Sequence, residues 1–101
     1  MNYNCIFFYN GSTRSQNITA NSESEARKKM EDIIRIHYTN CDCEVLVAEG
    51  IGERKRDFKL FMEINGSRVA QSISATSKEN AIGYFRKNYP QHSNWKVISI
   101  Q

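Results

Sequence analysis

Apolar and polar residues alternate in one stretch of the second half of the chain and in a matching stretch at the N-terminus. The alternating apolar positions are Phe58, Leu60, Met62 and Ile64 in the second half, and Tyr3, Cys5, Phe7 and Tyr9 near the N-terminus. A period of two predicts a strand with one buried face. At the N-terminus, Ile6 and Phe8 make the other face apolar as well. We therefore expect the first strand to be covered on both faces.

The dipeptide Asn-Gly follows each of these strands, as Asn10-Gly11 and Asn65-Gly66. Asn-Gly favours the positive φ angles of a tight hairpin turn. Residues 14–20 and 69–75 should therefore fold back as antiparallel strands. The sequence predicts two β-hairpins with Gly11 and Gly66 at positive φ.

A helix is expected after each hairpin. Ser22 with Glu25, and Thr76 with Glu79, fit the capping box that satisfies free N–H groups at a helix start. Apolar residues at helical spacing follow in both segments, and the second helix should end before Pro90. A closing strand follows each helix. Its apolar positions, Val45 and Val47 in the first half and Ile98 and Ile100 in the second, correspond at a shift of 53 residues.

The two halves are also alike residue by residue. Residues 10–26 align with residues 65–81 at a shift of 55 without a gap, and eight of the 17 positions are identical, so the copies should share one local structure. The boundaries predicted are a first ββαβ unit at 1–49, a basic linker at 50–57 and a second ββαβ unit at 58–101. Together they should form one domain over residues 1–101, because one such unit is too small to bury its apolar face alone.

The fold class predicted is therefore α+β, a tandem duplication of a ββαβ unit. Within each unit, the helical crossover should make the second and third strands parallel and leave the first strand between them. The two units should pack about a pseudo-twofold axis, with two helices on a mainly antiparallel sheet system.

Composition places the chain among ordinary globular proteins, with 40% hydrophobic and 25% charged residues over 101 positions. No apolar stretch approaches the roughly 20 residues that span a bilayer, and no export signal precedes the first strand, so we expect a cytoplasmic protein without a membrane partner. An odd number of cysteines in such a chain is typical of reduced thiols. Cys5, Cys41 and Cys43 are expected to be free.

Little in the sequence indicates a metal or a reaction. His37, Cys41 and Cys43 are the types of residue that bind zinc, but Cys-Asp-Cys lacks the common spacing and no fourth ligand is near. Nucleophile elbows, phosphate-binding glycine loops and metalloprotease motifs are missing from the sequence. We expect no metal, no cofactor and no catalytic residues, and hence no enzyme.

Two sets of residues are candidates for binding a partner. The basic run Arg54-Lys55-Arg56, extended by Lys28 and Arg35 of the first helix, could attract nucleic acid or could be a solvated surface, because a pI near 8.8 leaves the partner undecided. The outward aromatic residues Phe8 and Phe61 could be a second layer of core or a protein-binding patch.

The segments Ile18-Thr19-Ala20-Asn21-Ser22 and Ile73-Ser74-Ala75-Thr76-Ser77, each followed by a helix and a closing strand, resemble small ββαβ proteins of phages and mobile elements, including some anti-CRISPR inhibitors. That resemblance implies a compact binding protein that blocks a surface of a larger host machine. We therefore expect an inhibitor that occludes a protein or protein–nucleic acid complex. The alternative is a domain that binds nucleic acid directly through its basic surface.

Overall fold

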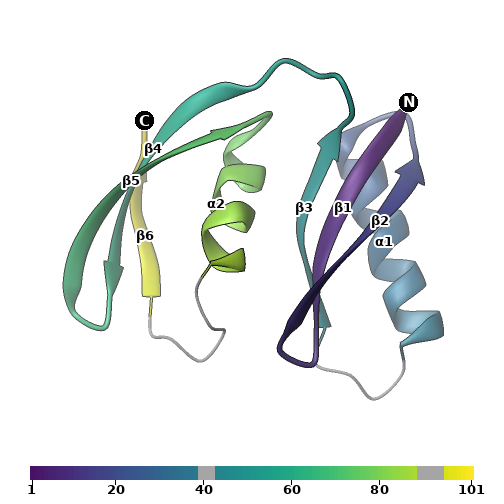
Figure 1. Ribbon diagram of the computed structural model, residues 1–101, viewed down its shortest axis with the longest axis horizontal. Coiled ribbons are helices and arrows are strands. Elements are labelled where there is room, and N and C mark those ends of the chain that lie inside the picture. The colour runs from purple at the N-terminus through teal and green to yellow at the C-terminus, as the bar shows by residue number, and fades with distance from the viewer. Residues whose placement is uncertain (39–42, 89–94) are drawn as a thin grey trace.

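The computed structural model describes residues 1–38, 43–88 and 95–101. The elements follow in the order β1 (Asn2–Tyr9), β2 (Ser12–Thr19), α1 (Glu23–His37), β3 (Cys43–Gly50), β4 (Arg56–Ile64), β5 (Ser67–Ala75), α2 (Lys78–Lys87) and β6 (Trp95–Ile100). The ββαβ order is thus present in both halves of the chain, and the α+β class is confirmed (Figure 1).

The strands form two separate three-stranded sheets. Sheet A has the order β2-β1-β3 and sheet B has the order β5-β4-β6. The central strand of each sheet is antiparallel to both neighbours, so the second and third strands of each unit are parallel with the first strand between them, as predicted.

Both predicted hairpins are confirmed. The φ angles of Asn10 and Gly11 are 49° and 87°, and those of Asn65 and Gly66 are 51° and 86°. Positive φ at both central residues is the two-residue turn that matches the right-handed twist of the flanking strands. Glycine at the second position allows this conformation without a steric cost.

The helix caps occupy equivalent positions in the two units. The Ser22 hydroxyl accepts a hydrogen bond from the Glu25 N–H at 3.1 Å, as predicted. The cap expected at Thr76 is wrong, because the Ser77 hydroxyl accepts from the Asn80 N–H at 3.1 Å and α2 begins one residue later. Ser22 and Ser77 are 55 residues apart, so the ungapped alignment gives the caps more accurately than the capping-box pattern.

A β-bulge interrupts the same place in each sheet. The register shifts between Ile6 and Phe7 in sheet A and between Phe61 and Met62 in sheet B, leaving Leu46 and Ile98 as the extra residues on the third strands. The equivalent residues of β3 and β6 are therefore 52 positions apart, not 53 as the sequence alignment predicted. A bulge breaks the period of two, so alternation alone placed β6 one residue out of register.

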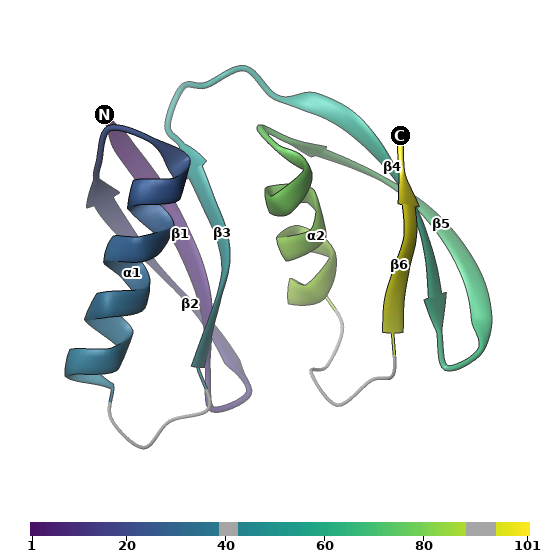
Figure 2. The ribbon, with the colours of Figure 1, turned by 180° about the vertical axis from the view of Figure 1, so that it is seen from behind.

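The helices and sheets are stacked in one direction as α1, sheet A, α2 and sheet B (Figures 1 and 2). Helix α1 packs on the three strands of sheet A, whereas α2 packs on β3 and also on β4 and β5. The predicted pseudo-twofold packing is wrong, because a twofold would place α1 on sheet B as α2 lies on sheet A. The two units instead follow one another in the same orientation.

The first strand is covered on both faces, as its two-sided apolar pattern predicted. On one face, Cys5 and Phe7 pack with α1 around the fully buried Met30. On the other face, Ile6 and Phe8 form a second cluster with Leu46 and Val47, against Tyr84 of α2. Sheet A is thus the only one of the two sheets, within the described residues, with an apolar core on each side.

Helix α2 approaches the backbone of β3 closely at one glycine. A Cβ atom at Gly83 would lie 1.9 Å from the carbonyl oxygen of Leu46 and 2.9 Å from a methyl group of Val47. No side chain fits in that space. Gly83 therefore sets the distance at which the second unit docks on the first.

A buried polar network completes the junction between the units. The side-chain amide of Asn80, which is fully buried, accepts from the Ala48 N–H at 2.9 Å and donates to the Ala48 carbonyl at 2.8 Å. It also donates to Glu23 at 3.0 Å and accepts from Arg27 at 2.7 Å. Asn80 thereby satisfies the outer edge of β3, which lies at the margin of sheet A.

The connection between the units is shorter than predicted. Arg56 and Asp57 pair with Ala75 and Ser74 in sheet B, so only residues 51–55 lie between β3 and β4. None of the helices in the described part of the chain combines the length and the apolar character needed to cross a bilayer.

Candidate binding surface

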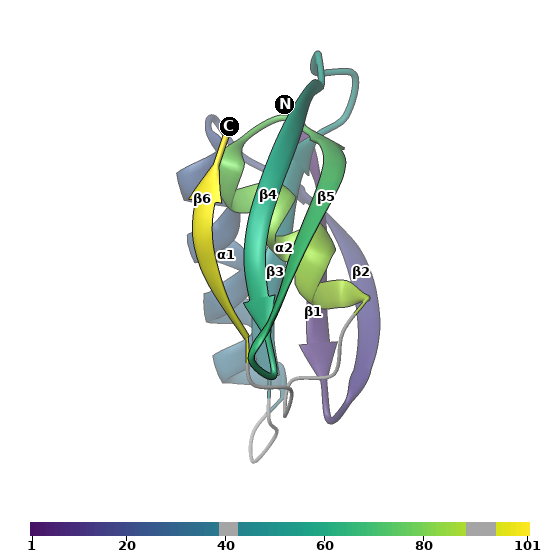
Figure 3. The same cartoon turned by 90° about the vertical axis from the view of Figure 1, so that its left-hand side faces the viewer.

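The face of sheet B that points away from α2 is the outer end of the stack. Figure 3 views this face directly, with β6, β4 and β5 in front and α2 behind. Alternate residues of β4 divide between the two faces. Phe58, Leu60 and Met62 are buried toward α2, whereas Lys59 is exposed and Phe61 is partly exposed on the outer face.

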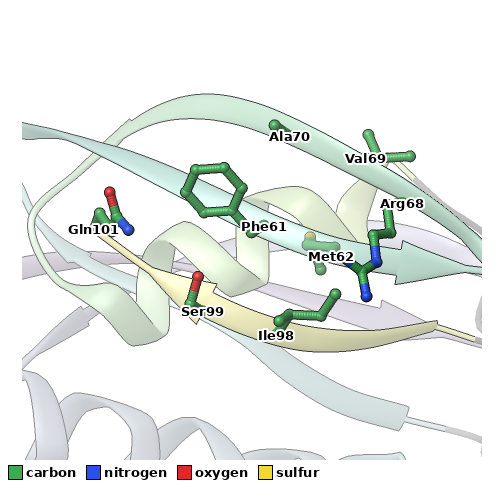
Figure 4. Close-up of a pocket in the computed structure, with 8 residues that line it drawn as sticks. All are labelled: Phe61, Met62, Arg68, Val69, Ala70, Ile98, Ser99 and Gln101. Atoms are coloured by element: carbon green, nitrogen blue, oxygen red, sulfur yellow. The ribbon is translucent and has the colours of Figure 1, made fainter.

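An open hollow of about 380 Å³ lies on this outer face. Its lining comes from all three strands and comprises Phe61, Met62, Arg68, Val69, Ala70, Ile98, Ser99 and Gln101 (Figure 4). The ring of Phe61 stands on the central strand, between the β5 residues and the β6 residues. Ile98, the bulge residue of β6, is 49% exposed and is among the most exposed large apolar side chains of the described residues.

Charged side chains surround this apolar centre. Glu63 lies directly opposite Arg68 on β5 and Lys96 on β6. The Lys59 ammonium lies 5.5 Å from the centre of the Phe61 ring, within the range of a cation–π interaction. Three cations and one carboxylate give the rim an excess of positive charge. The outer face of sheet B is the name used below for this surface: an apolar centre of Phe61 and Ile98 with a charged rim of Lys59, Glu63, Arg68 and Lys96.

No protein-family model, curated protein or solved structure matches the chain. The internal comparison of the two sheets is therefore the guide to this surface. The matching registers make four positions of the outer face of sheet B equivalent to the buried cluster that α2 covers on sheet A. Ile6, Phe8, Leu46 and Val47 correspond to Phe61, Glu63, Ile98 and Ser99. The outer face of sheet B retains two of the four apolar positions.

The two aromatic residues predicted to bind a partner lie in different environments. Phe61 lies on the outer face of sheet B, but Phe8 is only 4% exposed in the cluster between sheet A and α2. Phe8 is therefore part of the core and is not available to a partner. Phe8 thus belongs to the core and Phe61 to the surface. Helix α2 covers the face of sheet A that carries Phe8, whereas no helix of the described residues packs on the equivalent face of sheet B.

Ile98 is a member of the surface that sequence reasoning missed. The alignment at a shift of 53 paired Ile98 with Val45, a residue packed against the α1 core cluster. The bulge instead makes Ile98 equivalent to Leu46 and turns it outward. In the sequence Val97-Ile98-Ser99-Ile100, alternation fits neither face cleanly, so no local signal separates the two possibilities.

The five basic residues predicted to bind nucleic acid are exposed but do not form one surface. Arg54, Lys55 and Arg56 lie at the connection between the units, whereas Arg35 is in the last turn of α1, which lies at the opposite end of the molecule (Figure 2). Several of these charges have partners within the chain. Lys55 lies 3.3 Å from Glu49, and Arg35 lies 2.7 Å from Asp32. Arg35 and the basic run are therefore at separate ends of the molecule (Figure 2), and both carry charges that are paired within the chain.

The residues considered for zinc are not brought together in the described part of the chain. His37 is exposed at the end of α1, and Cys41 lies outside the described residues. Cys43 is disulfide-bonded, so the prediction of three free thiols is wrong at this position. Cys5 is a free and buried thiol, and burial raises its pKa from 9.0 to about 11.

The buried carboxylate of Glu49, in the first unit, is held by two residues of the second unit. It accepts hydrogen bonds from the Tyr84 hydroxyl at 2.6 Å and from the Thr76 N–H at 3.0 Å. Burial, followed by the bond to this carboxylate, raises the pKa of Tyr84 well above its ordinary value. Glu49 and Tyr84 thus belong to the junction that holds the units together, not to a reactive site.

Proposed function

We propose that the protein is a non-enzymatic binding module that docks on a partner protein through the outer face of sheet B. The observation that carries the proposal is the exposure of Phe61 and Ile98 at the positions where sheet A carries core residues. An apolar centre with a charged rim is the usual anatomy of a protein–protein interface. Aromatic side chains seated at its centre are the most frequent anchors.

The chemistry of the hollow also supports binding over catalysis. Among the described residues, its lining combines apolar side chains with Arg68, Ser99 and Gln101, and it includes no carboxylate, histidine or cysteine that could act as a general base or nucleophile. A hollow of this type can receive an apolar side chain of a partner. We extend the proposal to the class implied by the phage-protein resemblance, an inhibitor that occludes a surface of a nucleoprotein complex in the cytoplasm.

The coincidence of turns, caps and bulges in the two units supports a further part of the proposal, which is that the units arose by tandem duplication. Gly11 and Gly66, and Ser22 and Ser77, are each 55 residues apart. After duplication, α2 of the second unit covered one face of sheet A, and the equivalent face of sheet B stayed open for a partner.

The test is affinity capture with nuclease-treated lysate and matched variants. The double variant Phe61→Ala/Ile98→Ala removes the apolar centre, and Arg54→Glu/Lys55→Glu/Arg56→Glu reverses the basic run. Circular dichroism establishes that each variant is folded. A partner protein captured by the wild type should be retained by the triple variant. The double variant should bind it at least about 30-fold more weakly, since truncating anchors of this kind costs about 2 kcal/mol or more.

The opposite pattern would overturn the proposal in favour of direct nucleic-acid binding. In that case the purified protein binds bare DNA or RNA at sub-micromolar affinity, the triple variant loses that binding, and log affinity falls linearly with log salt. The double variant would then bind as well as the wild type.

A further inference from the structure

We propose that the occupant of the outer face of sheet B is an α-helix of the partner protein, seated as α2 is seated on sheet A. This inference rests on the proposed function and deepens it by naming the kind of partner. The chain itself contains the precedent, because the first unit presents an equivalent face to α2. Three features of that contact specify the chemistry of the missing helix.

The first feature is a close approach at a small residue. Gly83 lets α2 approach the Leu46 carbonyl of β3 so closely that a Cβ would meet it at 1.9 Å. Ile98 is equivalent to Leu46 and occupies the same bulge of β6. A helix seated in the same way on sheet B therefore needs a glycine, or another very small residue, opposite Ile98.

The second feature is an amide that satisfies an exposed strand edge. Asn80 bonds both the N–H and the C=O of Ala48. Ile100 is the equivalent residue of β6. Its neighbour Gln101 exchanges both backbone hydrogen bonds with Lys59, at 2.8 and 2.9 Å, so the N–H and C=O of Ile100 point away from β4. An asparagine one turn before the small residue can bond that pair as Asn80 bonds Ala48.

The third feature is charge complementarity. On sheet A, Glu44 of β3 forms an ion pair with Arg86 of α2. The residue equivalent to Glu44 on sheet B is Lys96, and the remainder of the rim carries Lys59 and Arg68 against the single carboxylate of Glu63. The charge at this position is reversed. The partner helix should therefore carry an acidic residue where α2 carries Arg86.

A second copy of this chain does not meet these requirements. The position of α1 equivalent to Gly83 is Lys28, and those equivalent to Asn80 and Tyr84 are Glu25 and Lys29. Lys29 is already paired with Glu25 at 3.1 Å. The outer side of α1 thus carries a bulky charged residue where a close approach is needed. Stacking of copies through α1 on the outer face of sheet B is therefore disfavoured.

The probe that tests the inference is a synthetic peptide with the sequence of residues 76–88 and the change Arg86→Glu, held helical by a staple on its solvent-facing side. A short peptide is only marginally helical without such a constraint. Binding is followed by amide chemical shifts of the isotope-labelled full chain. We expect a Kd on the order of 100 μM, with the shift changes concentrated at Phe61, Ile98 and Ile100.

Two control peptides and one protein variant sharpen the test. A peptide with the additional change Gly83→Leu should bind at least about tenfold more weakly, because the close approach is blocked. The peptide that keeps Arg86 should bind several-fold more weakly to the wild type. For the Lys96→Glu variant the order of the two peptides should reverse. The peptide with Arg86 should bind more tightly than the peptide with Glu at that position, because an arginine then faces a glutamate, as Arg86 faces Glu44 on sheet A.

The outcomes separate this inference from the proposed function. In one outcome, the apolar centre is required for capture of a partner but the peptide causes no shifts at 1 mM, a concentration that detects binding of roughly 4 kcal/mol or tighter. The helical occupant is then wrong, and the proposed binding surface stands. Equal binding of the Gly83→Leu peptide would also overturn the inference. Binding of a single-stranded oligonucleotide to the same amides, in preference to the peptide, would make the occupant a nucleic acid. Concentration-dependent dimers in sedimentation would make it a second copy.

Discussion

The face of sheet A that meets α2 and the outer face of sheet B have the same strand order, the same bulge and equivalent positions, yet among the described residues only the first is covered. On sheet A, α2 buries Ile6 and Leu46. On sheet B, the equivalent Phe61 and Ile98 are partly and largely accessible. The difference between them is therefore not in backbone architecture. It lies in whether a helix of the described residues packs on that face, as α2 does on sheet A.

The comparison of the two helices explains why the stack has two unlike ends. Helix α2 has Gly83 and Asn80 on the side that meets sheet A, and Tyr84 packs against the cores on both of its sides. Helix α1 has Lys28 and Glu25 at the equivalent places. Charged side chains on the outer side of α1 therefore disfavour packing of another sheet there. The apolar centre on the outer face of sheet B allows another element to pack on it.

The largest expected effect compares equivalent apolar residues on the two outer faces. Ile6→Ala should lower the free energy of unfolding by about 3 kcal/mol, because it opens a cavity in a closed cluster. Phe61→Ala should lower it by less than about 1 kcal/mol, although it deletes more atoms, because that side chain already faces solvent. Urea denaturation of both variants measures the difference. Equal losses would show that both faces are covered alike.

A smaller effect is expected from alanine at equivalent positions of the two helices. Gly83→Ala should cost about 2 kcal/mol despite the better helix propensity of alanine, because its Cβ meets the backbone of β3 and forces α2 outward. Lys28→Ala is the matched control and should change stability by no more than about 0.5 kcal/mol. Thermal melts of the two variants are sufficient. A neutral Gly83→Ala would contradict the close docking of the units.

The elements of the fold could be predicted from the sequence because each depends on local physics. Alternation identified the strands, and the two-sided pattern of Ile6 and Phe8 correctly indicated a strand with two covers. Asn-Gly gave both turns. The capping box misplaced one cap by a residue, because Thr76 and Ser77 are both good caps and only the repeat distinguishes them.

The packing of the units and the extent of the surface could not be predicted in the same way. A pseudo-twofold was inferred from the repeat, but packing depends on which side of each helix can approach a sheet. The signal was present in Gly83 and Asn80, two residues of lower helix propensity in the interior of α2. The bulge that turns Ile98 outward left no local pattern, so half of the apolar centre was found only from the structure.

The junction between the units should also weaken at alkaline pH. Burial raises the pKa of Tyr84, whose ordinary value is 10.0, and that of Cys5 from 9.0 to about 11. Groups with a raised pKa contribute stability that is fully present below their unfolded pKa and is lost as pH rises toward the folded value. The urea midpoint should therefore be steady from about pH 7 to 8.5 and fall above about pH 9.

The variant Tyr84→Phe isolates the part of this loss that belongs to the junction. It removes the phenol that would have to ionise beside Glu49, so its midpoint should fall less steeply between about pH 10 and 11 than that of the wild type. Part of the loss should remain because Cys5 is unchanged. Identical pH profiles for the two proteins would exclude Tyr84 as a cause.

Amide hydrogen exchange at Ala48 and Ile100 tests the central claim most directly, because these residues occupy equivalent strand positions and only Ala48 has a helix at its strand edge. The Ala48 N–H donates to the buried Asn80 side chain at 2.9 Å, whereas the Ile100 N–H points away from β4. The account predicts that Ala48 exchanges only through opening of the junction and that Ile100 exchanges roughly 100-fold faster or more. Equal protection of the two amides would contradict it, since the outer edge of sheet B would then be covered as that of sheet A is.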